Sequence, residues 1–232
     1  MELFLLGIAL ATALFTGINN GGSNIGVAFG PAVGSGSISL AVAGWLMTLS
    51  VVLGGYLVGP YVVETLGTRL VDIDHMTLGT GTVILLFTGL GILFGNIRGV
   101  SVSTSETAVG AIAGLGAAVN SLHWETLGVI VSWWLVSPLI ALLISGFIGR
   151  YWYQRIKGRL QLHATRPKRV LAKALILLVA CYMGFSAGAS NVANAVAPLV
   201  GSGHMEMTVA VLFGALAMGI GGLIFGSRTM RT

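Results

Sequence analysis

The sequence predicts an all-α membrane protein built as an inverted-topology repeat with broken or re-entrant helices. Three observations predict this fold class: a very apolar composition, long runs without charge and an internal duplication. Hydrophobic residues make up 55% of the 232 residues and charged residues only 8%, whereas about a quarter of the residues of a soluble domain are charged. This composition excludes a cytosolic enzyme and a nucleic-acid binder that relies on a basic patch.

Seven apolar segments approach or exceed the roughly 20 residues that a helix needs to cross a hydrocarbon core. Four of them predict continuous helices, at 38–63, 77–97, 126–149 and 206–227. The other three, at 3–36, 99–118 and 171–204, are crowded with Gly, Ser, Asn and Thr and predict helices interrupted by irregular backbone. Such breaks occur at membrane depth only where protein or a water-filled cavity satisfies the freed backbone groups.

Basic residues gather in one stretch, since eight of the twelve Lys and Arg lie between Arg150 and Lys173. If every segment crosses once, this stretch follows five crossings, and the positive-inside rule predicts that it is cytoplasmic and the N-terminus outside. We therefore expect a multi-pass protein of the cell (inner or plasma) membrane. Its predicted parts are a first repeat at 1–149, a basic cytoplasmic loop at 150–173 and the start of a second repeat at 174–232.

The internal duplication has an offset of 167 residues. Residues 21–36 read GGSNIGVAFGPAVGSG, residues 188–203 read GASNVANAVAPLVGSG, and nine of the sixteen positions are identical. An odd number of crossings per repeat means that the second copy inserts upside down. Secondary transporters are built from such inverted repeats, with half-helix N-termini that point free N–H groups at an anion near the midplane.

The second copy is shorter than the first. If the repeat unit is about 165 residues, the second copy stops at the equivalent of Thr65. We expect a homo-oligomer, or a separate chain that completes the second repeat.

Two motifs resemble those of one family. The run Gly188-Ala189-Ser190-Asn191-Val192-Ala193-Asn194-Ala195 resembles the duplicated GANDVANA signature of the PiT inorganic phosphate transporter family, and Val102–Ile112 looks like its Pro-Val-Ser-Thr-Thr-His segment leading into VGAI. The resemblance implies an ion-coupled symporter for inorganic phosphate in the lipid bilayer, driven by sodium or protons. Related members that carry sulfate make a sulfate permease the alternative.

The candidate substrate-binding residues follow from the duplicated Ser-Asn pairs and from these two motifs. They are Ser23, Asn24, Ser190, Asn191, Asn194, Ser103, Thr104 and Ser105. In the family signature an Asp stands where Asn24 and Asn191 stand here, and hard cations prefer charged oxygen ligands. Asn24 and Asn191 thus remain candidates for ion coupling only through neutral oxygens.

Glu106 is the best candidate for the coupling group. It is the one acidic residue well inside an apolar segment, and desolvation among small residues would favour its protonated form. We expect coupling to a proton rather than to sodium, and no other cofactor and no structural metal. A passive channel is the competing function, because paired Asn-bearing half-helices also suit a pore for neutral solutes.

Overall fold

The computed structural model describes residues 2–98, 102–160 and 166–229. Within them the chain is helical, as predicted, apart from short turns and an isolated bridge between Val71 and Leu122. The helices are α1 (Glu2–Gly34), α2 (Leu40–Glu64), α3 (Leu78–Arg98), α4 (Thr104–Ala118), α5 (Trp124–Tyr151), α6 (Tyr153–Leu160), α7 (Arg166–Asn191), α8 (Ala193–Gly201) and α9 (Met207–Thr229). Six helical segments of the described residues are long and apolar enough to cross a membrane, namely Glu2–Gly34, Leu40–Arg69, Leu78–Arg98, Trp124–Tyr151, Val170–Gly201 and Met207–Phe225.

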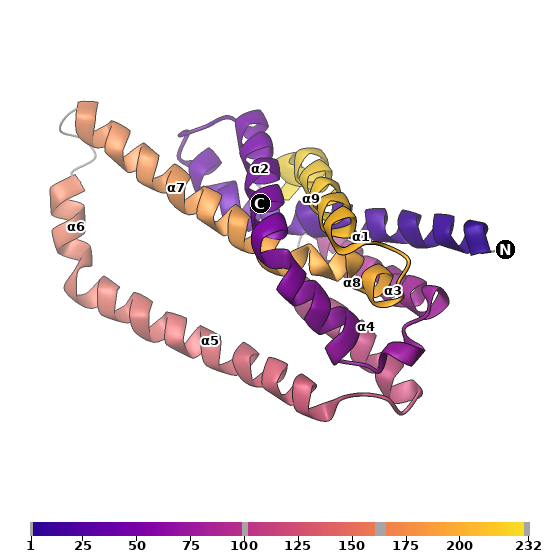
Figure 1. Cartoon of the computed structure of the whole chain (residues 1–232). Helices are drawn as coiled ribbons and strands as arrows, with labels where there is room; N and C mark the ends of the chain where they lie inside the picture. Colours follow the sequence, from indigo (N-terminus) through magenta and orange to yellow (C-terminus); the bar gives the residue numbers. More distant parts are fainter. Residues whose placement is uncertain (1, 99–101, 161–165, 230–232) are drawn as a thin grey trace.

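Each repeat begins with two long helices, and the first helix of one repeat packs on the second helix of the other. Accordingly, α1 packs mainly on α9, and α7 packs mainly on α2 (Figure 1). Glycines permit these crossings. A methyl group at Gly21 would overlap the carbonyl oxygen of Met218, and a methyl group at Gly188 would overlap that of Val51. Gly188 lies 167 residues after Gly21, and Met218 lies 167 residues after Val51. The two contacts are therefore equivalent, and the duplication seen in the sequence is also a repeated packing arrangement.

The equivalent helices α2 and α9 run antiparallel. Gly44 near the start of α2 faces Leu223 near the end of α9, whereas Gly59 near the end of α2 faces Val211 near the start of α9. An approximate two-fold axis perpendicular to both helices therefore relates the two repeats. This is the relation that an inverted-topology repeat requires.

The predicted helix interruption is wrong for the segment 3–36, whereas the segment 171–204 is divided between α7 and α8. The helix α1 is continuous over 33 residues and passes through Pro31. The segment 171–204 is interrupted only at Val192, between α7 and α8. The backbone angles of Val192 remain helical, with φ −58° and ψ −38°. The glycines of these segments serve close helix packing rather than helix breaks, which explains why a Gly-rich composition was misleading.

The helices α3 and α4 form a hairpin, and the end of α3 lies beside the middle of α1. Near the end of α3, Asn96 donates a hydrogen bond from Nδ2 to the carbonyl oxygen of Asn19, at 2.9 Å. At the open end, the bridge between Val71 and Leu122 joins the two flanking loops. The prediction that 99–118 crosses the membrane once is therefore wrong in its described part. The helix α4 has 15 residues and is only about 22 Å long.

If α3 and α4 are counted as a re-entrant hairpin in place of two crossings, the number of crossings before Arg150 stays odd. The predicted side of the basic stretch is therefore unchanged.

The helix α5 stands apart from the other helices, as the salmon ribbon in Figure 1 shows. It contributes no buried residue. Only Leu127, Ile130 and Trp134 near its start pack against the core. The core itself lies between α1, α2, α3, α4, α7, α8 and α9 and includes the fully buried Phe29.

Candidate functional site

The two signature segments meet on the two-fold axis. Nδ2 of Asn191 donates a hydrogen bond to Oδ1 of Asn24, at 3.1 Å, and these two residues are equivalent by the 167-residue offset. A contact between equivalent residues means that the axis passes between them. The duplicated Asn side chains predicted from the sequence therefore form one site rather than two.

A third asparagine, Asn20, holds this pair in place and was not predicted. It is fully buried, and its Nδ2 donates to the carbonyl oxygen of Asn191 at 2.7 Å. Its Oδ1 and carbonyl oxygen both accept from Nδ2 of Asn24, each at 2.8 Å. The repeat gave no signal for Asn20, because the equivalent residue is Ala187.

The start of α4 points at the same place. Ser103 caps the helix by accepting a hydrogen bond from the backbone N–H of Glu106 at 3.3 Å. Oγ of Ser105 donates to Oδ1 of Asn191 at 2.9 Å. The first N–H groups of a helix have no intrahelical partner and carry the positive end of the helix dipole. The hairpin therefore brings an anion-attracting helix end to the asparagine pair.

These elements enclose a pocket of about 190 Å³. Its lining residues come from α1, from the segment before α4, from α4 and from α7, and they are Ser23, Asn24, Val27, Val102, Ser103, Thr104, Ser105 and Asn191. The volume corresponds to a few water molecules at about 30 Å³ each, and so to one small inorganic ion. No lining residue is acidic, basic or a histidine, so the pocket offers neutral hydrogen-bonding groups.

Six of the eight predicted substrate-binding residues line this pocket, and two do not. Asn194 lies behind it and is only 2% exposed. Its Nδ2 is 3.4 Å from Oγ1 of Thr104 and 3.4 Å from Oδ1 of Asn191, while its Oδ1 accepts no hydrogen bond from a described residue. Ser190 lies outside the pocket and is exposed, and its hydroxyl donates to the Ser186 carbonyl oxygen at 2.9 Å.

Glu106 does not line the pocket. Its side chain is exposed, on the face of α4 that also carries Gly110 and Gly114. The expectation that small residues of this chain enclose the carboxyl group is therefore wrong. The buried face of α4 is instead set by Thr104, Ala108 and Val109. Glu106 nonetheless occupies the first turn of α4, one residue from Ser105.

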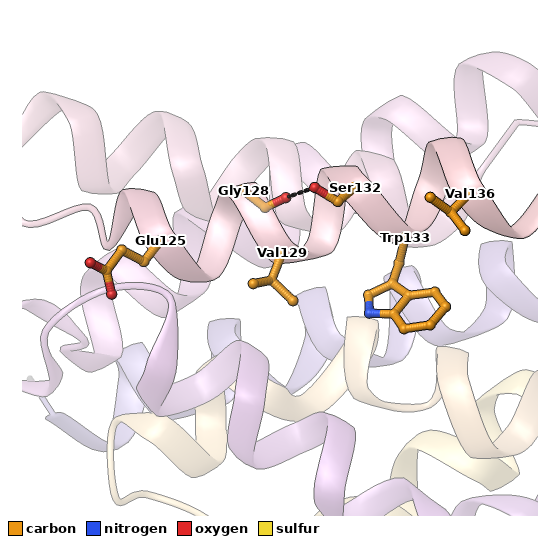
Figure 2. A pocket seen from close by; sticks show the side chains of 6 residues that line it. All are labelled: Glu125, Gly128, Val129, Ser132, Trp133 and Val136. Carbon is orange, nitrogen blue, oxygen red and sulfur yellow. Dashed lines mark hydrogen bonds between the residues drawn. The ribbon is translucent and has the colours of Figure 1, made fainter.

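Another hollow runs along α5 and has a volume of about 490 Å³. Figure 2 shows its lining residues, which are Glu125, Gly128, Val129, Ser132, Trp133 and Val136. The hydroxyl of Ser132 donates to the Gly128 carbonyl oxygen at 2.7 Å, so it is used within the helix. This hollow is a mostly apolar surface, and no group of three or more His, Cys, Asp or Glu suited to a metal occurs in the described part of the chain.

Comparison with known proteins gives a family that agrees with this geometry. The chain is 31% identical over 226 residues to the sulfate permease CysP of Bacillus subtilis (strain 168), and the match covers 97% of the chain and 62% of the permease. The chain thus spans less than two thirds of that relative. Its fold matches a solved structure of the sodium-dependent phosphate transporter, with a TM-score of 0.77, 20% identity and coverage of 98% of this chain and 77% of that one.

The profile of the phosphate transporter family matches residues 20–157 and 153–232. This match includes both signature segments and the α3–α4 hairpin that together form the pocket. The chain therefore belongs to the phosphate transporter family.

Proposed function

We propose that this chain carries a tetrahedral inorganic oxyanion, of the phosphate and sulfate class, through the cell membrane in symport with a cation. The observation that carries the proposal is the pocket at the two-fold axis, which combines Asn24 and Asn191 from the two repeats with the N-terminal end of α4. Phosphate is the substrate in the family's description, and sulfate is the substrate in the name of the Bacillus subtilis relative.

Neutral groups suffice to bind an anion here. A helix N-terminus offers backbone N–H groups and a favourable dipole, and hydrogen bonds to a charged acceptor are stronger than those between neutral groups. Ser23, Ser103 and Thr104 add hydroxyl groups to the pocket lining. Because no ionised base lines the pocket, the anion can be released without separating a salt bridge.

The position of the pocket favours alternating access over a passive pore. In inverted-repeat transporters the repeats move against each other around a fixed central site. Here the Asn24–Asn191 hydrogen bond joins the two repeats directly beside the pocket. A movement that separates the repeats would break this bond and open the site from another side.

Glu106 is the proposed proton carrier. It lies on the first turn of α4, next to Ser105, which bonds the second signature segment within the helix bundle. A carboxylate inside a bilayer is costly, and protonation removes this cost. Since the neighbouring Ser105 lines the pocket and bonds Asn191, a change of charge at Glu106 would act on the anion through the same helix turn.

Uptake into proteoliposomes that contain the purified chain tests the proposal. We expect uphill accumulation of labelled phosphate or sulfate under an imposed proton gradient, and a loss of this gradient dependence in Glu106→Gln. Ser137→Ala is the matched control, because its hydroxyl only bonds the Trp133 carbonyl oxygen on α5. Downhill flux without accumulation would indicate a channel. Uptake driven by sodium and unchanged in Glu106→Gln would show that the coupling ion and its residue are different.

A further inference from the structure

The chemistry of the pocket distinguishes between two kinds of tetrahedral oxyanion. We infer that it selects an anion that carries no proton at neutral pH, such as sulfate, over one that does, such as phosphate. This inference rests on the proposed function, because it concerns the same pocket. The difference between the two substrates is that hydrogen phosphate must donate one or two hydrogen bonds when it is bound, whereas sulfate only accepts them.

The amide oxygens of Asn191, Asn24 and Asn20 are already used as acceptors, and the one unused amide oxygen nearby among the described residues, Oδ1 of Asn194, belongs to a residue that does not line the pocket. Oδ1 of Asn191 accepts from Ser105 at 2.9 Å and lies 3.4 Å from Nδ2 of Asn194. Oδ1 of Asn24 accepts from Asn191 at 3.1 Å. Oδ1 of Asn20 accepts from Asn24 at 2.8 Å. A phosphate hydroxyl would have to compete with these internal bonds, and the pocket lining contains no carboxylate to receive it.

Donors, by contrast, remain available. The side chain of Ser23 is only 7% exposed, and among the described residues no hydrogen-bond partner is found for it. The hydroxyls of Ser103 and Thr104 accept hydrogen bonds from Glu106 and Asn194, so their protons are free to be donated. The backbone N–H groups of Thr104 and Ser105 belong to the first turn of α4. They have no acceptor within the helix and can therefore donate to an anion.

The balance of donors and acceptors decides the selectivity. A site that leaves a buried polar group of the ligand unpaired loses affinity for that ligand, by an amount larger than the value of an ordinary hydrogen bond. Sulfate pairs all its oxygens with donors. Hydrogen phosphate would have to place its hydroxyl against a neutral Ser or Thr hydroxyl, which is a weaker acceptor than a carboxylate, or would break a bond within the asparagine network.

Two matched pairs of anions separate protonation from size. Sulfate and selenate carry no proton at pH 7.5, whereas phosphate and arsenate of similar shape carry at least one. The experiment measures equilibrium binding of all four anions to the purified 232-residue chain in lipid nanodiscs. We expect sulfate and selenate to bind at least about tenfold more tightly than phosphate and arsenate. Equal or tighter binding of phosphate and arsenate would overturn the inference and leave the proposed function intact, whereas absence of binding by all four would contradict the proposed function itself.

A variant tests whether the asparagine network causes the preference. Asn24→Asp adds a carboxylate acceptor to the pocket with little change in shape. It should reduce the ratio of sulfate to phosphate affinity, and of selenate to arsenate affinity, at least about tenfold. Ser137→Ala, on α5 and outside the pocket, should leave both ratios unchanged. A folded Asn24→Asp chain that keeps the wild-type ratios would show that the selectivity does not arise in this network and would overturn the assignment.

Discussion

The helices α5 and α9 are similarly apolar but lie in different surroundings. Both are candidate membrane spans. Half of the residues in the most apolar stretch of α9 are buried, whereas none of the residues in the most apolar stretch of α5 is buried. Their glycines show the reason. Gly221 of α9 lies directly against the carbonyl oxygen of Ile18, and Gly219 lies against Thr48. Gly128 and Gly146 of α5 have open space in front of them.

This comparison shows what hydropathy reports and what it does not. Apolar composition indicates that a helix resides in the membrane, because lipid and protein interior are both apolar. It does not tell which helix faces protein. In this chain the distinction depends on whether small residues of one helix coincide with backbone of another, which becomes visible only in the folded arrangement.

The largest expected effect is at the glycine crossings. Gly21→Ala should destabilise the chain by about 3 kcal/mol, because the added methyl group would overlap the backbone of Met218, which cannot move aside like a flexible side chain. Gly146→Ala on α5 should be neutral or stabilise by up to about 1 kcal/mol, because Ala favours helix over Gly. Thermal unfolding in detergent checks both, and similar unfolding temperatures for the two variants would contradict the comparison.

The next largest effect is expected on anion affinity, at the pocket that Asn191 lines. Asn191→Ala removes the partner of Ser105 and of Asn24. A hydrogen bond that supports or contacts a charged ligand is worth about 1.5–3 kcal/mol, so anion affinity should fall more than tenfold. Isothermal titration against the wild type is the measurement. Unchanged affinity in a folded variant would mean that the Ser-Asn pairs serve only helix packing.

A smaller effect is expected on α5. Trp133 is 59% exposed, and it lines the apolar hollow in Figure 2. Trp133→Ala should change the free energy of unfolding by no more than about 0.5 kcal/mol in detergent, because the side chain has few packing partners. A loss of several kcal/mol would show instead that α5 is covered in the assembled protein.

The smallest effect is at the start of α9. Glu206 accepts hydrogen bonds from the backbone N–H groups of Thr208 and Val209, both at 3.1 Å, and these bonds lower its pKa. A carboxyl group with a lowered pKa in the folded chain stabilises it above the unfolded pKa, and this contribution is lost as pH falls through the folded pKa.

We therefore expect Glu206→Gln to unfold at a slightly lower temperature than the wild type at neutral pH, and at the same temperature once the carboxyl group is protonated. Unfolding curves recorded across the acidic range check this. A difference that persists at the lowest pH would show that the charge of the carboxylate is not what stabilises the start of α9.

The sequence predicted the membrane fold, the duplication and most of the pocket. The similarity of residues 21–36 to 188–203 was enough to pair Asn24 with Asn191, because equivalent residues can meet on a two-fold axis. Asn20 escaped prediction because its counterpart is alanine. Ser190 was predicted by its equivalence to Ser23, but α4 covers only one side of the axis in the described residues, so that Ser23 lines the pocket and Ser190 does not.

The continuity of α1 and the position of Glu106 could not be predicted from local sequence. Glycine and proline within an apolar run suit both a broken helix and a closely packed one. The choice depends on which helix lies opposite, and for α1 this is α9, about two hundred residues later in the chain. In the same way, the face of α4 that carries Glu106 is determined by contacts with α3, α7 and α8.

The packing of α1 on α9 also means that α1 must wait for α9 to be synthesised before this contact can form. The carbonyl oxygen that Gly21 contacts belongs to Met218, and at about 5–20 residues per second a ribosome needs roughly 10–40 s to make the intervening segment. During this interval the glycine face of α1 has no permanent partner in the bilayer. The glycine face of α1 thus reaches its final neighbour late, and until then α1 depends on lipid, on the translocation machinery or on its contacts with α3, which the folded chain retains.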